Sequence, residues 1–104
     1  MYIKEAKTEN DVETYLVKEC KQSDILCYKF VSPSNVGVPD RILIYKGNTY
    51  YVETKSPGEK PRLSQQIVHK RFKEHGVIVH IIDSKSGVDN IIKTIKMKRG
   101  KKHE

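Results

Sequence analysis

The sequence has few cysteines and lacks long apolar runs. These two features argue against disulfide-rich, zinc-binding and membrane-spanning classes of protein. The two cysteines, Cys20 and Cys27, form no CxxC pair and lack the spacing of paired metal ligands. Both alternate with apolar neighbours, which predicts buried free thiols rather than a disulfide or a zinc site. We find no N-terminal signal and no apolar run long enough to span a bilayer, so we expect a protein of a reducing cytoplasm, neither secreted nor membrane-spanning.

The apolar fraction is low, at 37%, and charged residues make up 32% of the chain. The apolar residues are nevertheless periodic, which predicts one folded domain over residues 1–104 rather than disorder. We find no internal repeat, and the four histidines have no metal-ligand spacing among themselves. The formal net charge of +7 indicates a polyanionic partner, with nucleic acid the first choice. A basic protein that is merely soluble is the competing interpretation.

Hydrophobic periodicity and turn signals predict a mixed α/β domain with the element order αβββαβα. A helix should begin after Thr8, which can act as its N-cap, and bury Val12, Leu16 and Cys20. The expected helices cover residues 9–22, 63–75 and 88–96, and the expected strands cover 26–32, 41–46, 49–52 and 77–83. The last strand is nearly all apolar, which predicts a central position in the sheet. The basic tail at 97–104 is expected to be frayed.

Two short motifs flank the expected hairpin: GVPD at residues 37–40 and ETK at 53–55. With Gly47 and Asn48 as the central turn residues, Asp40 would lie opposite Lys55. Because residues two apart in a strand share a face, Asp40, Glu53 and Lys55 should converge at one end of the sheet. Two carboxylates and a lysine are costly to desolvate together unless they hold a cation. This pattern predicts a metal-dependent phosphodiesterase site.

The order and spacing of the motifs resemble the PD-(D/E)xK nuclease superfamily, and within it the virus-type replication–repair nuclease (VRR-NUC) domain in its stand-alone bacteriophage form. The matching segments are TENDVE at 8–13, KFVSP at 29–33, GVPDR at 37–41, VETK at 52–55 and KPRLSQ at 60–65. The resemblance implies a restriction-endonuclease-like core with a mixed central sheet flanked by helices. For a phage protein, the expected location is the cytoplasm of the bacterial host.

The resemblance also implies which residues carry the chemistry. Asp40 and Glu53 would bind Mg²⁺ or Mn²⁺, ions that take hard oxygen ligands. Lys55 would position or deprotonate the attacking water, or stabilise the pentacoordinate phosphate. The family places a further glutamate, which faces the metal and would be a third ligand, on the first helix. Glu9 matches it best, because Glu9 shares a face with Val12 and Leu16, and Glu13 is the alternative.

The family's glutamine on the second helix corresponds to Gln65 or Gln66. We favour Gln65, which shares a helix face with Val68 and Phe72. Gln66 instead aligns with His69 and Lys73 on the face expected to be solvent-exposed. Its expected role is to hold a water or a phosphate oxygen near the metal. Five basic residues could contact phosphates, although a solvated basic face is the competing interpretation: Lys60, Arg62, Lys70, Arg71 and Lys73.

Stand-alone relatives are homodimers that cut branched DNA, including four-way (Holliday) junctions, so the resemblance implies a structure-selective endonuclease. The alternatives are a non-catalytic basic DNA-binding module and a restriction-type duplex endonuclease. A dimer interface could use Tyr45, Tyr50 and Tyr51 of the hairpin and the apolar stripe at 91–95, unless these residues cover the domain's own core.

Overall fold

The computed structural model describes residues 5–98 and confirms the predicted element order. The helices are α1 (Glu9–Gln22), α2 (Leu63–Glu74) and α3 (Lys85–Met97), and the strands are β1 (Leu26–Lys29), β2 (Arg41–Tyr45), β3 (Asn48–Thr54) and β4 (Val79–Ile82). Residues 99–104 of the predicted frayed tail lie outside the described residues. Within residues 5–98, each helix is too short or too polar to cross a membrane.

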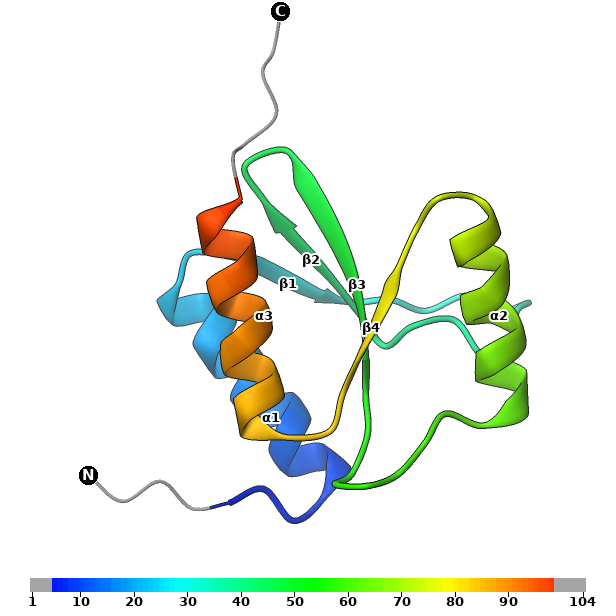
Figure 1. Ribbon diagram of the computed structural model, residues 1–104, viewed down its shortest axis with the longest axis horizontal. Coiled ribbons are helices and arrows are strands. Elements are labelled where there is room, and N and C mark those ends of the chain that lie inside the picture. The colour runs from blue at the N-terminus through cyan, green and yellow to red at the C-terminus, as the bar shows by residue number, and fades with distance from the viewer. Residues whose placement is uncertain (1–4, 99–104) are drawn as a thin grey trace, which may run out of the picture.

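The sheet is mixed and has helices on both faces (Figure 1). Its strands follow the order β1-β2-β3-β4, with antiparallel neighbours except for the parallel pair β3–β4. Helices α1 and α3 pack against each other and cover one face, while α2 lies apart from them, beside β4 on the other. This arrangement confirms the predicted fold class.

The core lies between the sheet and the α1–α3 pair. Thr8 caps α1, because its side chain accepts a hydrogen bond of 3.1 Å from the backbone N–H of Asp11. Val12, Leu16 and Cys20 are fully buried on the inner stripe of α1, as predicted. The side chain of Ser84 caps α3, which therefore begins earlier than predicted. With this stripe buried, the N-terminus of α1 lies near the C-terminal end of β3 (Figure 1).

The predicted hairpin register is wrong by two residues. The turn residues are Lys46 and Gly47, with φ of 47° and 82°, so Tyr45 pairs with Asn48. A two-residue turn of this kind needs positive φ at both central positions. Asn48 instead belongs to β3 and is buried. Extending the register by one pair beyond Arg41 and Val52 places Asp40 opposite Glu53 rather than Lys55.

A slip of two residues preserves the face on which each side chain lies, whereas a slip of one would have reversed it. Tyr50 and Val52 therefore face α1 and α3 within the core, and Tyr51 contacts Phe72 on the α2 face. By the same alternation Glu53 lies on the α2 face.

The predicted central position of the last strand is also wrong. β4 pairs with β3 alone in the described part of the chain and lies at one edge of the sheet. Its buried residue is Ile82, whereas Ile81 is 47% exposed. The apolar run at 77–83 reflects packing against helices rather than a strand neighbour on each side.

The first strand is shorter than predicted. β1 ends at Lys29, before the predicted end at residue 32.

Two further expectations concern cysteines and tyrosines. Cys20 is buried and Cys27 is half-buried, and both are free thiols, as predicted. For four of the residues offered for a dimer interface, the structure favours the alternative that they cover the domain's own core. Tyr50, Ile91 and Ile95 belong to that core, and Tyr45 packs against it. Tyr51 lies on the α2 face, outside the core, and is half-buried.

Candidate active site

An open cavity of about 340 Å³ lies where the end of β3 meets the starts of α1 and α2. The residues that line it are Glu9, Asp40, Glu53, Lys55, Glu59, Lys60, Arg62 and Gln65. The structure thus brings together all five residues whose catalytic role the sequence predicts. Their roles themselves stay predictions.

The GVPD loop is fixed against the start of α2. Gly37 has a φ of 100°, and a Cβ at this position would lie 2.5 Å from the backbone oxygen of Ser64. Glycine is therefore required both by the backbone conformation and by the close approach of α2. Pro39 is fully buried next to Asp40. These contacts determine where Asp40 enters the cavity.

Asp40 is oriented by Thr54, the middle residue of the ETK motif. Its Oδ2 accepts hydrogen bonds from the backbone N–H of Thr54, at 2.9 Å, and from the Thr54 hydroxyl, at 3.0 Å. Thr54 is fully buried, so these bonds are shielded from water. The sequence reasoning missed Thr54. Its position between the two motif residues was the available signal.

Glu53 is a buried carboxyl group, with 1% of its surface exposed. Its Oε2 accepts a hydrogen bond of 2.8 Å from Nε2 of Gln65. Its Oε1 is buried and has no hydrogen-bond partner among the described residues. Burial, and next the negative charge of Asp40, raise the pKa of Glu53 to about 7, against the lowering effect of Lys55.

Lys55 lies between two carboxylates at the floor of the cavity. Its Nζ is 3.6 Å from Oε2 of Glu53 and 3.8 Å from Oε1 of Glu59, and the residue is 4% exposed. The charged amine has three N–H donors and no acceptor. It can therefore reach a phosphate oxygen or a water at the cavity while remaining paired.

The two glutamines that the sequence offers differ in their contacts. Gln65 is buried, and its Oε1 accepts a hydrogen bond of 2.8 Å from the backbone N–H of Arg62. Because its Nε2 donates to Glu53, both polar atoms are engaged within the protein. Gln66 is exposed and donates to the carbonyl oxygen of Pro61. Gln65 thus anchors Glu53 to the start of α2.

Glu9 and Glu13, the two glutamates that the sequence offers on the first helix, also differ in position. Glu9 lines the cavity, and partial burial together with the charge of Asp40 raises its pKa. Glu13 forms an ion pair of 3.0 Å with Arg41 and is not part of the lining. Glu9 is therefore the first-helix glutamate able to contribute to this site.

The prediction that His69 lies on the solvent-exposed face of α2 is wrong. Its side chain is 11% exposed, and its Nε2 lies 3.9 Å from Oε1 of Glu53. Burial and the nearby charge of Lys55 lower the pKa of His69, which favours the neutral imidazole. The available signal was its spacing, because His69 follows Gln65 by one helical turn.

The predicted DNA-contacting residues fall into two groups. Lys60 and Arg62 line the mouth of the cavity. Lys70, Arg71 and Lys73 are exposed along α2. Both groups are accessible to a polyanion, and contact with DNA stays a prediction.

The donor set fits a small divalent cation that keeps most of its water. Among residues 5–98, no three acidic, histidine or cysteine side chains are already close enough to enclose an ion. Glu53 nevertheless has a buried oxygen without a hydrogen-bond partner among these residues. Its carboxyl group also lies near Asp40, whose negative charge raises the pKa of Glu53. Mg²⁺ is commonly held by one or two carboxylates with water in its other positions.

Comparison with known proteins points to nucleases. No protein-family model matches the chain. The chain is 42% identical over 77 residues to "Putative nuclease p44" of Acyrthosiphon pisum secondary endosymbiont phage 1, and the match covers 73% of this chain and 83% of the relative. A solved structure described as "VRR_NUC domain" matches with a TM-score of 0.75 and 29% identity, covering 82% of this chain and 94% of the other.

Proposed function

Because the chain belongs to the VRR-NUC family of nucleases, we propose that it is a metal-dependent endonuclease that hydrolyses phosphodiester bonds in branched DNA. The observation that supports this most directly is the convergence of Asp40, Glu53 and Lys55 on one cavity. Family membership accounts for the nuclease activity. The requirement for metal and the preference for branched DNA are our proposal.

Asp40 and Glu53 are the proposed ligands of Mg²⁺ or Mn²⁺, with Glu9 completing the acidic side of the cavity. When bound, the ion supplies charge neutralisation at the phosphate and acidifies a nearby water. Thr54 and Gln65 hold the two carboxylates in fixed orientations, so little reorganisation is needed during the reaction.

Lys55 is the proposed contact to the scissile phosphate or the attacking water. Its pairing with Glu53 and Glu59 prevents the side chain from swinging away into solvent. A fixed N–H donor in a site shielded from water stabilises developing negative charge much more than an exposed one does. Loss of this amine should therefore affect the chemical step more than DNA binding.

DNA would approach over the mouth of the cavity. Lys60 and Arg62 lie there, and the exposed cations of α2 extend the basic surface away from it. The net charge of +7 supports a polyanionic substrate and a strong dependence of binding on salt.

We propose that the active form is a homodimer. The described part of the chain, residues 5–98, contains one set of the residues Asp40, Glu53 and Lys55. Two coordinated cuts in opposite strands of a four-way junction therefore need two chains. An isologous dimer would relate its two sites by a two-fold axis, which suits the near two-fold symmetry of a junction.

The proposal is tested by incubating the purified protein with labelled linear duplex, flap and four-way DNA, each in Mg²⁺, Mn²⁺ and EDTA. We expect endonucleolytic cuts near the branch point with either cation and none in EDTA. Equal cleavage of linear duplex at one sequence would favour a restriction-type enzyme. DNA binding without cleavage in either cation would favour a non-catalytic module.

A further inference from the structure

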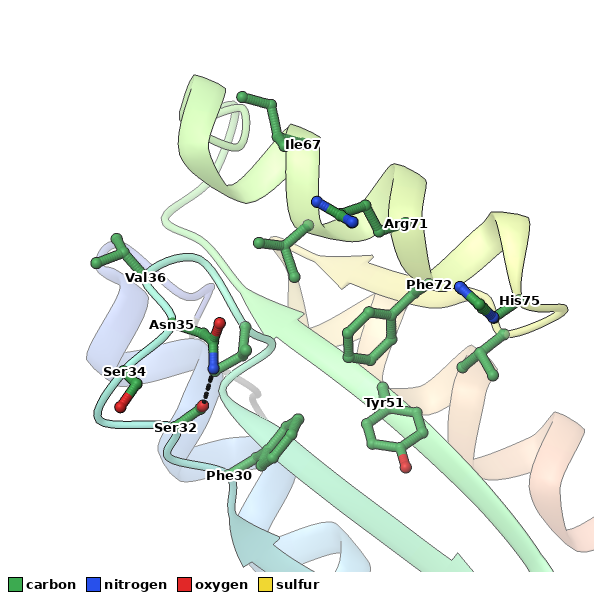
Figure 2. A pocket seen from close by; sticks show the side chains of 13 residues that line it. Phe30, Ser32, Ser34, Asn35, Val36, Tyr51, Ile67, Arg71, Phe72 and His75 are labelled. Atoms are coloured by element: carbon green, nitrogen blue, oxygen red, sulfur yellow. Dashed lines mark hydrogen bonds between the residues drawn. The ribbon is translucent and has the colours of Figure 1, made fainter.

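A second cavity, of about 830 Å³, opens between α2 and the loop after β1 (Figure 2). Three half-buried aromatic side chains, Phe30, Tyr51 and Phe72, line it. The ring centroid of Tyr51 is 5.8 Å from that of Phe30 and 5.4 Å from that of Phe72. The rings come from three separate segments, and Tyr51 packs against both of the others, at interplanar angles of 51° to Phe30 and 86° to Phe72. We call this cavity the aromatic groove.

The rim of the aromatic groove carries polar side chains and one arginine beside the exposed apolar side chains of Val36 and Ile67. Arg71 and His75 lie on its α2 side, and Ser32 and Asn35 lie on its loop side (Figure 2). Asn35 donates a hydrogen bond of 2.9 Å from Nδ2 to the hydroxyl of Ser32. None of the side chains that line the groove in the described structure is acidic. This charge suits a polyanionic ligand, and the amide and hydroxyls can meet the polar edge of a base.

The aromatic groove lies directly beside the candidate active site. Val38 lines the groove and Asp40 lines the catalytic cavity, and both belong to the GVPD loop. Two residues of chain span at most about 7 Å. On α2, Val68 lines the groove while Gln65 lines the catalytic cavity. The two cavities are therefore neighbours, on either side of the contact between the GVPD loop and the start of α2.

We propose that the aromatic groove receives an unpaired base of the DNA strand whose adjacent phosphate lies at Asp40 and Glu53. Aromatic rings stack on any unpaired base, and this contact tolerates differences in sequence. Bases that are already unpaired enter such a site at lower cost than bases that must first leave a duplex. The groove would thus favour branch points over linear duplex. This inference rests on the DNA nuclease function proposed above.

The test measures binding to a single probe base in EDTA, where the proposed cleavage does not occur. Two otherwise identical branched oligonucleotides carry one 2-aminopurine beside the branch point, unpaired in one and paired with thymine in the other. We expect the wild-type protein to bind the unpaired probe more tightly and to change its fluorescence, with little change for the paired probe. Equal affinities and no fluorescence change would overturn the proposal.

Two variants locate the base. Phe72→Leu and Phe30→Leu should each weaken binding of the unpaired probe by about tenfold, the typical effect of losing one stacking contact. Binding of the paired probe should change less than about twofold. Tyr28→Leu is the matched control, because Tyr28 is 58% exposed and does not line the groove. An equal loss with Tyr28→Leu would contradict the proposal, and the wild-type comparison remains decisive if a variant fails to fold.

The groove and the nuclease activity can fail independently. Metal-dependent cleavage combined with equal affinity for both probes would overturn the groove proposal alone. Selective binding of the unpaired probe without cleavage in Mg²⁺ or Mn²⁺ would support the groove and contradict the catalytic proposal. If a second copy of the chain fills the groove instead, Phe72→Leu should change the sedimenting mass without changing the preference between probes, and that result would also overturn the proposal.

Discussion

Oε1 of Glu53 and Nε2 of His69 lie 3.9 Å apart, and both atoms are buried without a hydrogen-bond partner in the described structure. Buried polar atoms are normally paired, so these two atoms are the place where we expect a water or the proposed cation to bind. Burial favours neutral His69 and raises the pKa of Glu53. A small shift would let the imidazole N–H donate to the carboxylate once Glu53 is charged.

We predict that His69→Leu lowers the cleavage rate by about tenfold or more, because partners of metal-binding carboxylates typically contribute at that level. His69→Gln retains an N–H donor at a similar distance and should recover most of the loss. Single-turnover cleavage of branched DNA measures both rates. Equal rates for His69→Leu and wild type would show that the imidazole does not orient Glu53.

The two glutamates of α1 provide a matched pair for cation binding. Glu9→Gln should weaken binding of Mn²⁺ in calorimetry, because Glu9 lines the cavity. Glu13→Gln should leave Mn²⁺ binding unchanged and reduce thermal stability slightly, because it breaks the ion pair with Arg41. The reverse result would assign the first-helix ligand to Glu13.

In EDTA, Glu53 should make the free energy of unfolding depend on pH. Its pKa is raised from 4.5 to about 7, so the folded state binds this proton more tightly than the unfolded state. The protonated carboxyl group of Glu53 therefore contributes fully to the free energy of unfolding below about pH 4.5, and this contribution is lost as pH rises through about 7. Glu53→Gln should therefore be more stable than wild type above pH 7, by on the order of 3 kcal/mol, and similar to it at low pH. Parallel denaturation profiles for the two proteins would contradict this.

Sedimentation at micromolar concentration tests the dimer. A species near twice the chain mass of 12.0 kDa is expected. A monomer that still resolves four-way junctions by paired incisions would rule out the dimer as the active form. Tyr45→Ala and Ile91→Ala are not useful probes of the interface, because both side chains pack in or against the core.

Periodicity was sufficient to predict the helices and their buried stripes, including Val12 and Leu16 of α1. The hairpin register could not be predicted, because Lys46 adopts positive φ, a conformation that few lysines adopt, while the expected turn residue Asn48 is taken into β3. The edge position of β4 was also missed. An apolar strand does not reveal whether helices or another strand cover it.

The convergence of Asp40 with Glu53 and Lys55 was predictable despite the wrong register, because a two-residue slip leaves each side chain on its original face. Spacing marks Thr54 and His69 as neighbours of Glu53 and Gln65, but it does not show what their side chains contact. The approach of His69 to Glu53 depends on which side of α2 packs over the end of β3, near the close approach of Gly37 to Ser64.

The most direct test of the catalytic proposal is the cleavage rate of Lys55→Ala on branched DNA in Mg²⁺, measured beside Lys93→Ala. Lys93 is an exposed lysine of α3 outside the cavity, so its variant controls for the loss of one positive charge. We predict that Lys55→Ala loses at least about a hundredfold in rate while its affinity for DNA stays near that of wild type, and that Lys93→Ala cleaves normally. Cleavage by Lys55→Ala at more than about a tenth of the wild-type rate would contradict the assignment of this cavity as the active site.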